Sequence, residues 1–169
     1  MMKTGMAILS LMAGIWAAWA LYAARSGQWA YLGGAIVALV PLLLMMRRRF
    51  DLRSAAEARR IGRLVGLASF AEVVAIVGGV QVLAREHRTD LIVCLIAAVV
   101  GLHFFPLAKW MPMPRYYLSG LALLAIGCVG LAIPTDERTL IVAGAASAIL
   151  WLTAVSLVLE RPRLTPTGG

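Results

Sequence analysis

The chain is poor in charge, in histidine and in cysteine. Charged residues make up 14% of the 169 positions, where a typical soluble domain carries about a quarter. Two cysteines are too few for a disulfide scaffold, and two histidines without paired carboxylates predict no metal site and no cofactor. With 62% hydrophobic residues, this composition excludes an ordinary soluble enzyme, a disordered tail and a nucleic-acid-binding domain.

Long apolar runs are what the chain has in abundance. A helix needs about 20 mostly apolar residues to cross the hydrocarbon core of a bilayer. The pattern predicts an all-α integral membrane protein: a bundle of six transmembrane helices that forms one transmembrane domain over residues 1–169. The predicted helices cover approximately residues 5–24, 28–46, 55–83, 91–109, 115–134 and 139–159.

The basic residues predict the orientation. Net charge is +8, and in a membrane protein such an excess reports orientation rather than a nucleic-acid partner. Twelve of the 16 Lys and Arg residues fall on the cytoplasmic side when the N-terminus is placed there. We therefore predict cytoplasmic termini and a multi-pass protein of the inner membrane. The first apolar run, of about 18 residues, exceeds the ~7–15 of a signal peptide, which favours an uncleaved helix.

A basic patch lies between the second and third spans. Ser54 and Glu57 have the spacing of a capping box, which predicts that the third helix begins near Ala55 and runs unbroken into the membrane. The patch is typical of a positive-inside anchor attracted to anionic lipid, and a specific lipid or protein docking site is the alternative. Its arginines are Arg47, Arg48, Arg49, Arg59, Arg60 and Arg63.

Glu72 and His103 are ionisable residues inside predicted spans. Charge near the bilayer centre is costly, so such residues usually face protein or a wet cavity. The rise of 1.5 Å per residue places Glu72 about 12 Å and His103 about 9 Å above the same inner boundary. Because their helices form an antiparallel hairpin, the two side chains are expected at matching depth, within reach of one another. Small residues beside Glu72 predict that its face packs against protein.

A proline interrupts the helix that carries His103. Pro106 lacks an N–H, so it frees the carbonyl of Leu102 and bends the helix. Interrupted helices at membrane depth often border binding sites. We therefore expect Gly101, Phe104 and Pro106 to form a bend with a pocket beside His103.

Three interpretations of the Glu72–His103 pair stay open. The pair is a packing lock, or a site that responds to protons or a small cation, because histidine titrates near neutral pH, or a pair of acid–base catalysts. The second predicts a transporter-like protein, and the compactness of the bundle then predicts a homodimer. The first predicts an accessory subunit whose basic patch docks lipid or a partner. An enzyme is the least favoured.

The outer ends of the helices carry weaker signals. His87 lies in a charged connection that could approach Asp136 and Glu137, although a solvated loop is the favoured interpretation. Cys94 and Cys128 lie within about 10 Å of the outer boundary. Because sequence alone cannot establish that their Cα atoms lie within disulfide range, we expect two separate buried thiols.

Residues 101–108, which read GLHFFPLA and are followed by Tyr116 and Tyr117, carry a family resemblance. They resemble a family of small uncharacterised multi-span bacterial membrane proteins with a G-[IL]-H-F-x-P-L-A segment. The resemblance implies a multi-span bacterial membrane protein and draws attention to His103 and Pro106. It implies no mechanism.

Overall fold

The computed structural model describes residues 2–24, 29–46, 55–111 and 113–159, and every element in these ranges is helical. The all-α prediction is therefore confirmed for the described residues. The described part of the third helix begins at Ala55, and the predicted cap residue Ser54 lies outside the described residues. The six α-helices and two short 3-10 helices are α1 Met2–Ala23, α2 Trp29–Met46, α3 Ala55–Arg85, η1 Thr89–Leu91, α4 Ile92–Trp110, α5 Pro114–Val129, η2 Gly130–Ala132 and α6 Thr135–Leu159.

Four helical stretches are long and apolar enough to cross a membrane: Arg59–Arg85, Thr89–Trp110, Pro114–Ala132 and Thr135–Leu159. Two further apolar stretches, Ala7–Ala23 and Leu32–Leu44, are shorter. Among the described residues, four of the six predicted spans thus contain an apolar stretch long enough to cross a membrane, and two contain a shorter one. This pattern is that of a membrane protein.

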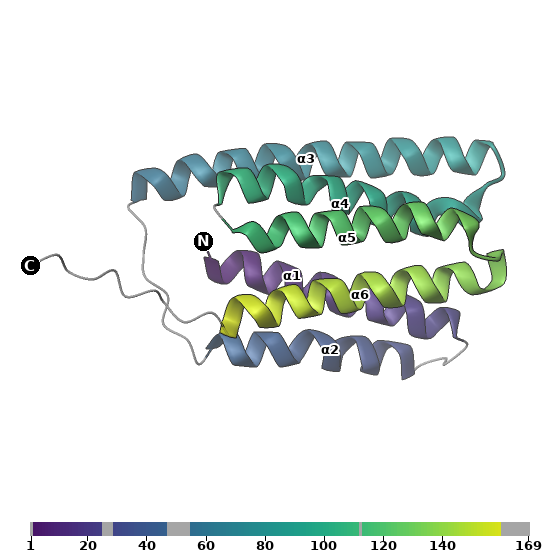
Figure 1. Ribbon diagram of the computed structural model, residues 1–169, viewed down its shortest axis with the longest axis horizontal. Helices are drawn as coiled ribbons and strands as arrows, with labels where there is room; N and C mark the ends of the chain where they lie inside the picture. Colours follow the sequence, from purple (N-terminus) through teal and green to yellow (C-terminus); the bar gives the residue numbers. More distant parts are fainter. Residues whose placement is uncertain (1, 25–28, 47–54, 112, 160–169) are drawn as a thin grey trace, which may run out of the picture.

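The helices run side by side along the long axis of the molecule (Figure 1). α1 packs against α2 and α6, and α4 packs against α5. α6 joins these two groups, because it also contacts α4 and α5. α3 packs mainly against α4 and lies at the edge of the bundle.

Glycines allow the closest helix contacts. A Cβ atom added at Gly14 of α1 would lie 2.6 Å from the carbonyl oxygen of Gly34 in α2. One added at Gly101 of α4 would lie 2.8 Å from the carbonyl oxygen of Gly120 in α5. Small residues matter here because packing, not the hydrophobic effect, drives helix association in lipid.

Polar side chains inside the bundle are matched to partners. Ser147 of α6 donates a hydrogen bond to the carbonyl of Ala13 in α1, at 2.9 Å. The hydroxyls of Ser119 and Thr153 lie 2.6 Å apart between α5 and α6. Within the described ranges, no buried side-chain nitrogen or oxygen lacks a hydrogen-bond partner. This agrees with the high cost of an unpaired polar group in an apolar environment.

Candidate functional site

The α3–α4 hairpin brings Glu72 and His103 together. His103 Nδ1 lies 3.4 Å from Glu72 Oε2, and 11% and 20% of the two side chains are exposed. That distance exceeds the 2.7–3.2 Å of a well-formed N–H···O hydrogen bond. The contact is therefore loose, and its strength depends on protons: an imidazolium beside a carboxylate is an ion pair, whereas a neutral imidazole is only a hydrogen-bond partner.

The face of α3 that carries Glu72 points toward α4. A Cβ atom added at Gly79, two turns along the helix, would lie 2.5 Å from Leu95 Cδ2 of α4. By contrast, Phe70 and Val74 on the opposite side are exposed. Gly79 thus packs closely against α4, whereas Ala75, three residues after Glu72, is exposed.

The pair alone supplies two ligand groups. Within the described part of the chain, no group of three or more His, Cys, Asp or Glu side chains is placed to hold a metal ion. Structural zinc sites use four protein ligands and catalytic sites three. Chemically, the pair is best suited to hold a proton or to contribute two ligands to a small cation.

Gly101 and Phe104 do not lie beside the pair, where we expected a pocket wall. A Cβ atom at Gly101 would lie 2.6 Å from the backbone nitrogen of Leu124, and the Phe104 ring packs edge-on against Tyr116 with centroids 5.5 Å apart. Both contacts are with α5. At about 100° per residue, neither position shares the face of His103. These residues fasten α4 to α5.

Pro106 lies inside α4, which continues from Ile92 to Trp110 without a break. The carbonyl of Leu102, the residue before His103, lacks its usual helical donor because of Pro106, but it lies within a continuous helix. The proline therefore does not divide α4 into two helices, and any bend that it causes lies within one helix.

The basic patch is described in part. Arg59, Arg60 and Arg63 are exposed at the N-terminal end of α3. The remaining patch arginines, Arg47, Arg48 and Arg49, lie outside the described residues, as does the cap residue Ser54.

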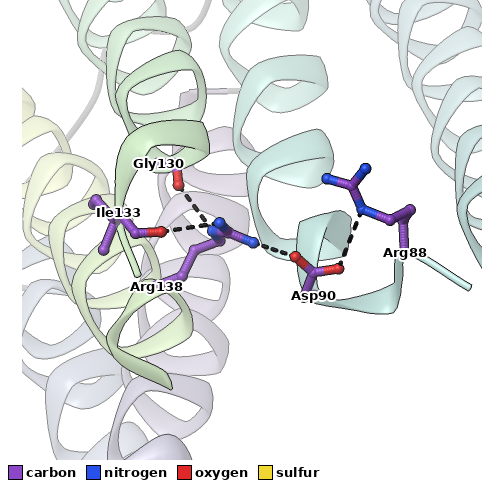
Figure 2. A network of polar contacts seen from close by, with 5 residues as sticks. All are labelled: Arg88, Asp90, Gly130, Ile133 and Arg138. Atoms are coloured by element: carbon purple, nitrogen blue, oxygen red, sulfur yellow. Dashed lines mark hydrogen bonds and ion pairs between the residues drawn. The ribbon is translucent and has the colours of Figure 1, made fainter. Parts of the chain in front are cut away.

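A buried arginine forms a polar network that the sequence analysis missed (Figure 2). Arg138, near the start of α6, is 7% exposed. Its Nε donates to the carbonyl of Gly130 and its Nη2 to that of Ile133, each at 2.9 Å. Its Nη1 contacts the carboxylate of Asp90 in η1, and Arg88 Nε lies 3.8 Å from the same carboxylate. We call Arg138, Asp90, Gly130 and Ile133 the polar clamp.

The polar clamp ties the α3–α4 connection to the α5–α6 connection. The sequence analysis began the last helix at about residue 139, after Arg138, and named Asp136 and Glu137 of this connection as possible neighbours of His87. The available signal was periodicity: Val142 and Ala146, four and eight residues after Arg138, are both buried. Arg138 therefore begins the buried face of α6.

A thiol lies next to the polar clamp. A Cβ atom at Gly130 would lie 2.7 Å from Cys94 Sγ, so Cys94 packs against Gly130, whose carbonyl accepts from Arg138. Both cysteines are free thiols, and Cys94 is buried, as the sequence predicted. The prediction that Cys128 is buried was wrong, because this residue of α5 is exposed.

A second polar cluster fastens the opposite end of α5 and α6. Arg115 Nη1 donates to the carbonyl of Ser156 at 2.6 Å, and Ser119 Oγ donates to the carbonyl of Arg115 at 3.0 Å. The Ser119–Thr153 contact continues this cluster into the bundle. α5 and α6 are therefore held by polar contacts at both ends.

Among known proteins, a family of unknown function, DUF7010, matches residues 1–160. No curated protein and no solved structure matches the chain. The expected membership of an uncharacterised family is confirmed, and the motif at residues 101–108 as its signature stays a prediction.

Proposed function

The chain belongs to DUF7010, a family of unknown function, and we propose that it is a small membrane protein whose Glu72–His103 pair responds to protons or a small cation. The observation that supports this proposal is the 3.4 Å contact between the two side chains across the α3–α4 hairpin. Gain or loss of a proton by either residue converts this contact between an ion pair and a neutral one.

We further propose six membrane spans in a bacterial inner membrane, with both termini in the cytoplasm. The 22 residues of α1 and the 18 of α2 correspond to about 33 and 27 Å of helix, close to the ~30 Å of the hydrocarbon core. Both lie alongside α6 over most of its length (Figure 1). The excess of basic residues on one side supports the orientation.

In a transporter-like protein, Glu72 is the proton carrier or cation ligand and His103 is its partner. The pair lies on the hairpin at the edge of the bundle rather than among α1, α2 and α6. A translocation path for a proton or cation along this hairpin needs protein on its other side, to separate it from lipid. We propose that a second copy of the chain supplies it, in a homodimer.

The second candidate is an accessory membrane subunit in which the pair is a packing lock. The observation that favours it is the position of α3, which packs mainly against α4. A polar contact between the two helices then fixes their register, and the basic patch of Arg59, Arg60 and Arg63 docks lipid or a partner.

Thermal unfolding of the detergent-purified protein between pH 5 and 9, with a panel of monovalent cations and small amines, tests the proposal. We expect a ligand to raise the midpoint of the wild type in a pH-dependent manner. Glu72→Gln should abolish this gain without lowering the midpoint in the absence of ligand, because glutamine keeps the shape and loses the charge. Glu86→Gln, which removes an exposed carboxylate beyond α3, is the matched control and should keep the gain.

The packing-lock candidate predicts another result. No ligand then shifts the midpoint, and Glu72→Gln keeps most of the stability. His103→Ala destabilises the protein by about 1–3 kcal/mol, because it leaves a buried polar group without its partner. That combination rejects the ligand-responsive site and directs attention to partners of the basic patch.

A further inference from the structure

α3 has less protein around it than the other long helices. None of the residues in its most apolar stretch is buried, whereas a third to a half are buried in the other three. Leu67 and Phe70 are each about two-thirds exposed. Lipid must therefore supply much of the environment of α3, although this helix carries one half of the Glu72–His103 pair.

The length of α3 shows where it meets the bilayer surface. Its 31 residues measure about 46 Å, more than the ~30 Å of the hydrocarbon core. Between Arg63 and Arg85 lie residues 64–84, in which Glu72 is the one ionisable side chain. These 21 residues cover about 31 Å, so Arg63 and Arg85 mark the two boundaries of the core.

The N-terminal end of α3 consequently projects beyond the hydrocarbon. Figure 1 shows it extending past the neighbouring ends of α4 and α5. Arg59, Arg60 and Arg63 are exposed on this projection. Arg63 lies three and four residues from the other two, so the three side chains neighbour one another. Ile61, on the same stretch, is 7% exposed.

Guanidinium groups at this depth match the phosphates of lipid headgroups. Arg63 lies at the boundary and Arg59 about 6 Å farther out. Each guanidinium offers planar, paired N–H donors that suit a phosphate oxygen pair, and it stays charged at all relevant pH values. Neighbouring arginines at a membrane surface favour anionic over zwitterionic lipid.

We propose that Arg59, Arg60 and Arg63 form a binding site for the phosphates of anionic phospholipids, and that lipid bound there holds α3 against α4. The inference rests on the proposed membrane orientation. It deepens the proposed function, because the lipid holds Glu72 within reach of His103. A lipid is favoured over an acidic protein because the arginines begin at the boundary of the hydrocarbon core, the level of the lipid phosphates.

The test is a lipid titration of the full-length protein in detergent, read as the shift of the thermal midpoint. Micelles contain phosphatidylglycerol or phosphatidylcholine, and a third series contains inorganic phosphate at the same phosphate concentration. We expect phosphatidylglycerol alone to raise the wild-type midpoint. The variant R59Q/R60Q/R63Q should need roughly a hundred-fold more of this lipid for the same shift, and R63Q roughly five-fold more.

Arg85→Gln is the matched control, because it removes one exposed arginine from the other end of the same helix. It should change the lipid requirement less than about two-fold, since Arg85 has no neighbouring arginine on α3. The single R63Q variant keeps the test decisive if the triple variant does not fold. Glu72→Gln should keep the wild-type lipid requirement, so failure of the proposed pair and failure of the lipid site give different results.

Three results would overturn the proposal. Equal losses in R63Q and Arg85→Gln would mean general charge attraction. A shift of equal size with inorganic phosphate would mean a site for free anions. Wild-type behaviour of R59Q/R60Q/R63Q would show that the arginines are not a lipid site and would leave an acidic protein as their partner.

Discussion

Arg138→Met is expected to lower the free energy of unfolding by about 3–5 kcal/mol. Arg138 is buried and serves three acceptors at once: the Asp90 carboxylate and the carbonyls of Gly130 and Ile133. Methionine fills a similar volume but donates nothing. It would therefore leave a partly buried carboxylate and two carbonyls without their common donor. Reversible unfolding in detergent measures the change.

Arg88→Met is the matched control for this substitution. Arg88 contacts the same Asp90 carboxylate, but at 3.8 Å and with 59% of its side chain exposed. An exposed ion pair contributes about 0–1 kcal/mol. Arg88→Met should therefore lower the free energy of unfolding by less than about 1 kcal/mol. Equal losses for the two arginines would contradict the polar clamp as the main contact at this end of the bundle.

Cys94 offers a second, local measurement of the same prediction. Its thiol lies next to Gly130 of the polar clamp and is buried, so a membrane-impermeant maleimide should label it slowly in the wild type. If the thiol reacts only after local opening of the structure, a loss of about 3 kcal/mol of stability in Arg138→Met should speed labelling roughly a hundred-fold. The exposed Cys128 is first replaced by alanine, so that Cys94 is the thiol that the maleimide labels.

Gly101→Ala should be the next most damaging change, with a loss of about 1–3 kcal/mol from overpacking. The added Cβ would lie 2.6 Å from the nitrogen of Leu124 and 2.8 Å from the carbonyl oxygen of Gly120. Both are backbone atoms of α5, so no side-chain rotation relieves the clash. α4 and α5 must move apart, and the Phe104–Tyr116 contact loosens with them. Unfolding free energy in detergent is again the measurement.

Gly66→Ala and Gly78→Ala in α3 are the matched controls. A Cβ atom at either position meets nothing within 4 Å. Because alanine favours a helix by about 1 kcal/mol over glycine, both variants should be neutral or slightly more stable. If Gly66→Ala were as costly as Gly101→Ala, the exposed side of α3 would have to pack against another protein surface, such as a second copy.

Sequence alone determined the properties that run along the chain. Hydropathy located the helices, whereas the start of the third helix near Ala55, inferred from the spacing of Ser54 and Glu57, stays a prediction because the described part of α3 begins there. The rise per residue placed Glu72 and His103 at matching depth before any contact between them was known. These inferences succeed because the length of apolar helix needed to cross a bilayer is set by the bilayer, not by neighbouring helices.

Only the tertiary structure decided which faces meet. It brought Glu72 to 3.4 Å from His103, turned Gly101 and Phe104 toward α5, and buried Arg138 against Asp90. Sequence alone could not predict which sides of the helices face one another. Lipid and protein interior are both apolar, so the lipid-facing and protein-facing sides of a helix carry similar residues. Small residues and a few polar contacts decide the pairing instead. Their partners lie far away in the sequence, 48 residues for Asp90 and Arg138 and 134 residues for Ala13 and Ser147.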